Sequence, residues 1–170
     1  MRTALIIVFA ANLVLVAVSH DMLPDRVATH FGTGGQADGW SSKNANTRLT
    51  IAMDAFIFCL LYYAPRWITV VPAKWVNLPN KEYWLTPANM ERTRGKLASL
   101  MWRFGIAFFL LFFAIGMLTL QANLAEPPCL NETRFLVALT AFMLYTVYWT
   151  VEVVRDFRIP KGGTPQSPRV

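Results

Sequence analysis

Two histidines and three aspartates lie within residues 20–38, and side chains of these types bind metal ions or transfer protons. Histidines together with carboxylates form common zinc sites. A histidine next to an aspartate can also act as a general base whose ring the carboxylate orients. The five residues are His20, Asp21, Asp25, His30 and Asp38.

The spacing of these residues favours a structural role. The sequence contains no HExxH motif or comparable set of closely spaced metal ligands. We therefore expect the His30 ring to bond to Asp38 or to a turn backbone. The main alternative is ligand binding by this segment, through His30, Phe31, Asp38 and Trp40. Because glycine-rich phosphate loops and serine nucleophile motifs are also missing, the sequence predicts no enzyme, no cofactor and no metal.

Most of the chain is too apolar for a soluble protein of this size. Of its 170 residues, 55% are hydrophobic and 15% are charged, whereas roughly a quarter of the residues in soluble domains are charged. The apolar residues form four blocks, at 3–19, 50–71, 100–120 and 135–154. Each block is close to the ~20 residues that cross a hydrocarbon layer, where the backbone must be helical.

These blocks predict an all-α fold, an integral membrane four-helix bundle that forms a single membrane domain over residues 1–170. The helices are expected at about 3–20, 44–71, 87–121 and 134–156, followed by a disordered tail at 157–170. Between them lie a short structured extracytoplasmic loop and a cytoplasmic loop at the membrane interface.

The distribution of lysine and arginine predicts the orientation of the helices. Twelve of the sixteen basic residues lie near the two termini or in the segment 66–103, and four lie in the other two loops. Cytoplasmic loops are enriched in positive charge, so both termini are expected in the cytoplasm. The net charge of +6 then reflects topology and lipid contact. Without a recognition motif it does not indicate nucleic-acid binding.

The first block also resembles a cleaved signal peptide, because Arg2 precedes it and residues 17–19 are small enough for cleavage. Its length and the central Asn12 favour a retained helix. Both alternatives place residue 20 onward outside, so the rest of the predicted topology is the same.

Residues 23–40 interrupt the apolar pattern. Pro24 ends the first helix, and the spacing of Leu23, Val27 and Phe31 suits a short amphipathic turn on the membrane surface. The glycines that follow suit a tight reversal instead, which would make a hairpin. Periodicity does not choose between these two structures. Ser41 is the expected cap of the second helix.

Polar side chains inside a membrane are costly, usually paired and often functional. Three of them fall in the outer half, on the first, second and fourth helices: Asn12, Asp54 and Thr140. Gly105 and Gly116 share one face of the third helix, since their separation is about three turns. Small residues on that face let a neighbouring helix approach closely.

Near the inner boundary the sequence predicts an ion pair between Arg66 and Glu152. At a rise of about 1.5 Å per residue, both residues lie ~24–27 Å along their helices and therefore at similar depth. Arg103 and Arg155 compete for the same carboxylate. Arg66 is preferred because a bond between helices would brace the break expected at Pro65.

The segment between the second and third helices is rich in prolines and aromatic residues. Thr86 followed by a proline indicates the start of the third helix. The expected role of the aromatic residues is anchoring at the membrane surface, and docking of a cytoplasmic protein is the alternative. The most distinctive residues of this loop are Asn77, Pro79, Asn80, Tyr83 and Trp84.

Two motifs resemble those of a bacterial membrane domain of unknown function. One is Leu23-Pro24, Val27, His30-Phe31, Gly35, Asp38-Gly39-Trp40 and Ser42-Lys43; the other is Pro65-Arg66, the run 77–85 and Pro87. The same domain forms the N-terminal part of SdpI-type immunity proteins, which protect against a peptide toxin. The resemblance implies a four-helix bacterial inner-membrane protein. It does not imply immunity, because those proteins are longer and contain further helices.

Three functional classes remain. The favoured one is a small binding, immunity or regulatory membrane protein that meets an envelope peptide or small ligand outside and a cytoplasmic protein inside. The second is a transport component that uses the intramembrane polar residues, assembled as a homo-oligomer because four helices enclose little space. The third is a metal-dependent membrane enzyme built on His30. The lipid bilayer is the partner that the composition itself requires.

Overall fold

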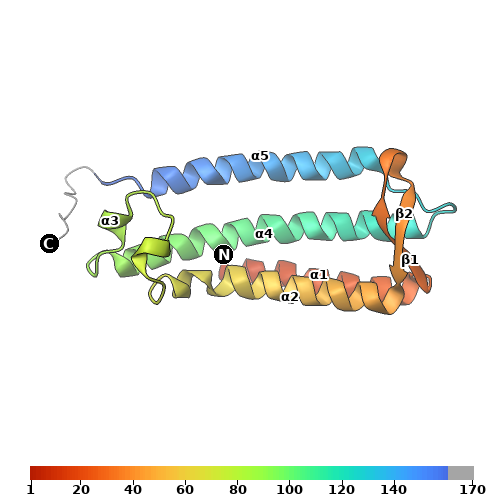
Figure 1. Cartoon of the computed structure of the whole chain (residues 1–170), viewed down its shortest axis with the longest axis horizontal. Coiled ribbons are helices and arrows are strands. Elements are labelled where there is room, and N and C mark those ends of the chain that lie inside the picture. Colours follow the sequence, from red (N-terminus) through yellow and green to blue (C-terminus); the bar gives the residue numbers. More distant parts are fainter. Residues whose placement is uncertain (161–170) are drawn as a thin grey trace.

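A computed structural model of the chain describes residues 1–160 and consists mainly of four long helices (Figure 1). They are α1 (Arg2–Met22), α2 (Lys43–Trp67), α4 (Met90–Asn123) and α5 (Glu132–Asp156). At one end, the hairpin end, strands β1 (Arg26–Phe31) and β2 (Ala37–Ser42) pair antiparallel around the 3₁₀ turn η1 (Thr33–Gly35). At the opposite α3 end, the loop between α2 and α4 contains η2 (Ala73–Trp75) and α3 (Lys81–Trp84).

The four long helices are long and apolar enough to cross a membrane, which confirms the predicted all-α membrane fold. Their outer faces expose large apolar side chains, among them Ile7, Phe56 and Leu144. A continuous apolar surface of this kind is costly in water, but it is what a helix presents to a hydrocarbon layer.

The helix α4 is the centre of the bundle. It packs against α1, α2 and α5, whereas α5 packs chiefly on α4 and lies across it from α1 and α2 (Figure 1). The close approach of α1 depends on Gly105 and Gly116, where a Cβ atom would lie 2.9 Å from Leu5 and 2.9 Å from Leu15. The predicted glycine face of the third helix is therefore confirmed.

The start of α2 corrects the predicted cap. Ser42, not Ser41, caps the helix: its Oγ accepts a hydrogen bond from the backbone N–H of Ala45 at 3.3 Å. Ser41 instead pairs with Val27 in the sheet. The hairpin includes Ser42, so α2 begins at Lys43. A cap at Ser41 would have placed the start of the helix one residue earlier.

Two helix boundaries differ by three or more residues from those predicted. α2 continues past Pro65 but ends at Trp67 instead of 71, where a turn begins. α4 begins at Met90 instead of 87. The Thr86 hydroxyl donates backward to the Tyr83 carbonyl at 3.0 Å, so it does not cap the helix that follows.

We expect Gly105→Leu to lower the free energy of unfolding by ~1–3 kcal/mol, because the added side chain must displace neighbours in a close-packed contact. Those neighbours are Leu5 and Leu61. Gly95→Leu is the matched control, since nothing lies within 4 Å of a Cβ atom there. Circular dichroism during SDS titration of purified protein measures both effects. Equal stability of the two variants would contradict the close-packing explanation.

Candidate functional site

Residues 26–42 form a hairpin, so the alternative of an amphipathic turn is wrong. Gly34 and Gly35 have φ angles of 80° and 72°, in the left-handed region that favours glycine. Their amides donate hydrogen bonds to the Glu132 carboxylate at 2.7 and 3.0 Å. The turn of the hairpin is therefore fastened to the start of α5.

His30 and Asp38 are hydrogen-bonded to each other across the hairpin, as predicted. Their side chains are 73% and 54% exposed, so the pair faces solvent. Trp40 lies under the Arg26 guanidinium, 4.9 Å from the ring centre. Of the four residues predicted to bind a ligand, His30 and Phe31 line a cavity beside α5, while Asp38 and Trp40 lie apart from it.

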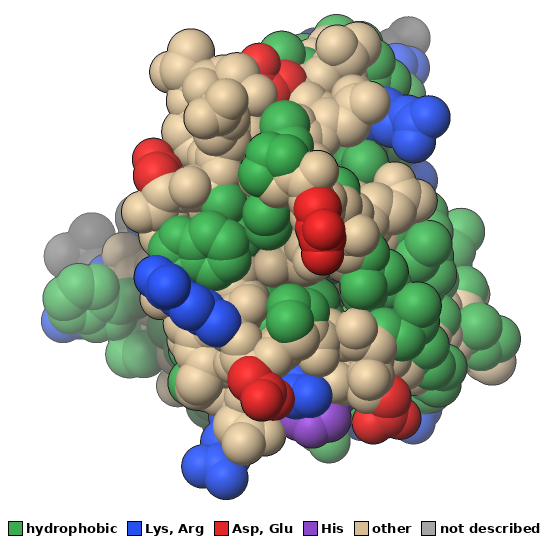
Figure 2. Space-filling model, turned by 90° about the vertical axis from the view of Figure 1, so that its right-hand side faces the viewer, with side chains coloured by type: hydrophobic (Ala, Val, Ile, Leu, Met, Phe, Trp, Pro, Cys, Tyr) green, Lys and Arg blue, Asp and Glu red, His purple; other side chains and the backbone are tan. Residues whose placement is uncertain are grey.

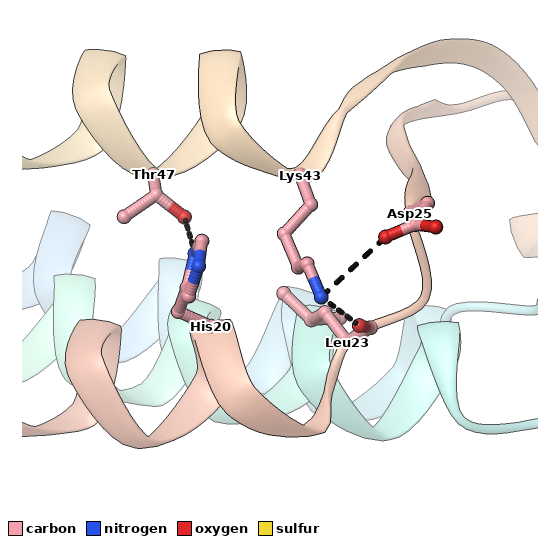
Figure 3. Close-up of polar contacts among 5 residues, drawn as sticks. All are labelled: His20, Leu23, Asp25, Lys43 and Thr47. Atoms are coloured by element: carbon pink, nitrogen blue, oxygen red, sulfur yellow. Dashed lines mark hydrogen bonds and ion pairs between the residues drawn. The ribbon is translucent and has the colours of Figure 1, made fainter.

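The junction of α1 and α2 uses three other ionisable residues of this end, His20, Asp25 and Lys43 (Figure 3). The His20 Nδ1 atom lies 2.9 Å from the Thr47 hydroxyl. The Lys43 amino group donates to the Leu23 carbonyl at 3.2 Å and lies 3.6 Å from the Asp25 carboxylate. These side chains are thus occupied in joining the helices. Within residues 1–160, no three His, Cys, Asp or Glu side chains are grouped to hold a metal ion.

A cavity of about 260 Å³, lined by both polar and apolar side chains, lies beneath the hairpin, between α1, α2 and α4. Strand β1 reaches it through Thr29. Asn12 and Asp54 lie at its deep end, since they are the lining residues farthest along α1 and α2 from the hairpin. Hydroxyl and amide groups alternate with apolar side chains on its walls; the polar wall residues are Ser19, Thr29, Asn46, Thr47, Thr50 and Thr119.

Asn12 has a structural role at the deep end of this cavity. Its side-chain amide donates to the Val8 carbonyl at 2.9 Å and to the Phe109 carbonyl at 2.9 Å. The second bond joins α1 to α4. Both donor hydrogens are therefore used inside the protein, as expected for a polar group at membrane depth.

Asp54 lies across the same cavity and is not satisfied in this way. The residue is 1% exposed, and its Oδ1 atom has no hydrogen-bond partner among residues 1–160. An unpaired buried carboxylate is costly. Within residues 1–160, three other buried side-chain atoms lack a partner, Trp102 Nε1, Arg103 Nε and Glu152 Oε2, but none of them lines this cavity.

Aromatic rings close the bundle below the cavity. Phe9 of α1 stacks on Phe58 of α2 with ring centroids 4.2 Å apart, and it meets Phe109 of α4 at 5.5 Å. Each ring lies about one helical turn beyond a residue at the deep end. The cavity is therefore a dead end toward the α3 end.

Thr140, the third intramembrane polar residue of the outer half, does not join Asn12 and Asp54 at the cavity. It is exposed on α5 and does not line the cavity. Because α5 lies on the far side of α4 (Figure 1), its side chains do not meet Asn12 and Asp54.

The predicted ion pair between Arg66 and Glu152 is wrong. Glu152 Oε1 accepts a hydrogen bond from Arg103 Nη1 at 2.6 Å. The Arg66 guanidinium instead lies 5.9 and 5.4 Å from the ring centroids of Tyr62 and Tyr63. Since α4 lies between α2 and α5, the arginine of α4 reaches the carboxylate and the arginine of α2 does not.

The loop motif at the α3 end secures the end of α5. Asn80 Nδ2 and Trp84 Nε1 both donate to the Phe157 carbonyl at 2.8 Å. Phe157 is buried against Trp84, which corrects the predicted disorder from 157; residues 161–170 of that predicted tail lie outside the described residues. Of the other motif residues, Tyr83 packs beside this cluster, Asn77 is exposed and Pro79 is half-buried.

The sequence analysis missed Asn123, which is buried near the end of α4. Its side chain accepts from the Ala28 amide at 2.7 Å and donates to the Ala28 carbonyl at 3.0 Å. Asn123 thus makes the two hydrogen bonds with Ala28 that a neighbouring strand would make, and it holds β1 over the cavity. The sequence feature that could have indicated this role is the position of an asparagine at the border of an apolar block.

A double-mutant cycle tests the observed ion pair. Arg103→Gln and Glu152→Gln should each destabilise the protein, with a coupling energy of ~0.5–3 kcal/mol because the residues are in direct contact. Arg66→Gln combined with Glu152→Gln is the matched control and should be additive. Unfolding in SDS measures all variants. Coupling to Arg66 but not to Arg103 would contradict the structure.

Residues 7–52 match the sequence profile of a domain of unknown function, DUF1648. The match includes most of α1, the whole hairpin and the first turns of α2, and it ends just before Asp54. No curated protein and no solved structure matches the chain. Over these residues, the match supports the presence of a domain of unknown function.

Proposed function

We propose that the chain is a bacterial inner-membrane binding protein whose ligand site is the cavity beneath the hairpin. The observation behind this proposal is the Asp54 carboxylate, which lines the cavity and has one buried oxygen without a partner among residues 1–160. An ionisable residue at membrane depth that had only a structural role would be paired. A ligand supplies the missing partner.

The closed floor favours binding over transport. Phe9, Phe58 and Phe109 lie between the cavity and the α3 end, so a solute that enters from the hairpin end has no polar route onward. A transport path would need polar groups along its whole length. We therefore propose a receptor or sequestering role, in an immunity or regulatory setting, with transport as the less favoured alternative.

We also propose that the protein performs no chemistry of its own. His30, the side chain best suited to proton transfer, lies on the exposed hairpin and bonds to Asp38. Asp54 lines a different cavity from His30. The buried carboxylate of Asp54 and the imidazole of His30 therefore do not share one site.

The hairpin end is proposed to face the outside and the α3 end the cytoplasm. The excess of basic residues near the α3 end supports this orientation. At the hairpin end, acidic and basic side chains are interspersed (Figure 2). α1 packs on α2 and α4 and lines the cavity, which supports its retention in the mature protein. An envelope ligand would then enter beside the hairpin, and a cytoplasmic partner would meet the α3 end.

Thiol labelling in intact cells tests this orientation. Cys59 and Cys129 are both free and exposed, so Cys59→Ala leaves Cys129 as a reporter at the hairpin end. We expect an impermeant maleimide to label Cys129 in intact cells. Ala88→Cys, placed in an exposed turn at the α3 end of a chain without natural cysteines, should be labelled after the cells are opened. The reverse result would invert the topology.

Native mass spectrometry tests the binding site. Protein extracted from its own host in mild detergent should retain a small-molecule adduct. Thr119→Phe should lose the adduct, because the ring fills the cavity between α4 and β1. Thr140→Phe, on the exposed face of α5, is the matched control and should keep it.

Circular dichroism and monodisperse elution establish that both variants are folded. An adduct that persists in Thr119→Phe would place the ligand elsewhere. Absence of any adduct from the natural chain would also contradict a tight binding site.

A further inference from the structure

We infer that the ligand of the cavity is a small organic cation and that Asp54 is its counter-ion. This inference rests on the proposed binding function and adds the chemical class of the ligand. It follows from the charge of the cavity, from the surrounding hydrogen-bond acceptors and from the apolar part of the wall.

The charge of the cavity wall has one sign. Among the described residues that line it, Asp54 is the one with an ionisable side chain. The Asp54 Oδ1 atom is buried without a partner. Bringing a cation to such a carboxylate offsets the cost of burying it, which a neutral or anionic ligand does not do.

The basic side chains nearest the rim do not neutralise Asp54. Lys43 is occupied by the Leu23 carbonyl and the Asp25 carboxylate, and the His20 ring is paired with Thr47 (Figure 3). Neither basic side chain therefore supplies a counter-charge to Asp54.

The hydrogen-bonding groups around Asp54 suit an ammonium group. Thr50 lies one helical turn from Asp54 and lines the cavity, and its hydroxyl donates to the Asn46 carbonyl at 2.9 Å. The hydroxyl oxygen therefore remains free to accept. An ammonium group has three donors and no acceptor, so it can bond to the carboxylate and to such hydroxyl oxygens at the same time.

The rest of the wall favours an organic ion over a metal ion. Leu15, Val16, Phe112 and Ile115 line the cavity beside the polar groups, and an alkyl chain can pack against them. Calcium takes six to eight oxygen ligands, commonly from several carboxylates, whereas this cavity provides one carboxylate. A volume of about 260 Å³ is below the range of drug-sized ligand sites, so the cation is small.

Labelling of a thiol inside the cavity tests both the site and its charge preference. Thr50→Cys is the reporter in a chain with Cys59→Ala and Cys129→Ala, and Ser19→Cys is a second reporter should the first not fold. Purified protein is treated with three methanethiosulfonate reagents: the cationic ethylammonium, the neutral methyl and the anionic sulfonatoethyl forms. For each reagent, the labelling rate of the reporter thiol is measured by mass spectrometry. It is then divided by the labelling rate of the exposed Cys129 in a Cys59→Ala chain.

We expect the normalised rate of the cationic reagent to exceed that of the anionic reagent by at least ~tenfold, as attraction or repulsion by one nearby charge implies. Asp54→Asn should abolish the preference. Asp21→Asn removes an exposed carboxylate at the hairpin end of α1. This variant is the matched control and should retain the preference for the cationic reagent.

Protection with reversible ligands gives a second measurement that needs no change at Asp54. Butylammonium should slow labelling of Thr50→Cys by the neutral reagent, while sodium at equal ionic strength and 1-butanol should not. Protection by sodium to the same extent would indicate an inorganic ion site and overturn the inference. Protection by 1-butanol to the same extent would show that charge is irrelevant.

The outcomes separate the two levels of the proposal. Failure of the neutral reagent to reach either reporter would mean that solutes do not enter the cavity, which refutes the binding function itself. Entry of all three reagents at equal normalised rates would leave the binding function standing and refute the cationic ligand.

Discussion

A hydrocarbon layer contains no water to satisfy polar groups, so each polar side chain at membrane depth must find its partner within the protein. The arrangement of the helices follows from this constraint. The Asn12 amide joins α1 to α4 through the Phe109 carbonyl. The Trp149 indole joins α5 to α4 through the Leu100 carbonyl at 2.9 Å. Such bonds select one packing arrangement among many, because apolar contacts between helices differ little from contacts with lipid.

Among the residues that line the cavity, Asp54 is the exception to this pattern. The other polar residue at the deep end, Asn12, uses both donor hydrogens inside the protein, and aromatic rings lie below the cavity. An unpartnered carboxylate in such a place destabilises the isolated protein. The same feature favours the binding of an oppositely charged ligand, because the carboxylate is already buried before the ligand arrives.

The hairpin is fastened to the bundle at several separate points. Asn123 of α4 holds Ala28 on both its amide and its carbonyl, and Glu132 of α5 holds the glycine turn. Lys43 holds the junction of α1 and α2. The roof of the cavity is thus built from contacts to each long helix, which explains why a short hairpin keeps a defined structure at the membrane surface.

The sequence by itself determined the membrane class, the number of spanning helices and the polar residues worth attention. Those features depend on composition and on local spacing: apolar blocks of membrane length, glycines on one helical face, and His30 close enough to reach Asp38 across a turn. It also marked Asn12 and Asp54, because isolated polar residues in apolar blocks are visible without a structure. Boundaries set by proline and glycine were less well determined, as the later start of α4 shows.

Only the tertiary structure decided which helices are neighbours. The ion pair assigned to Arg66 belongs to Arg103, and Thr140 faces away from the cavity, because α4 lies between α2 and α5. Depth along a helix follows from residue number at a fixed rise. The order of helices around the bundle depends on contacts between residues far apart in sequence, and spacing alone contains no information about them.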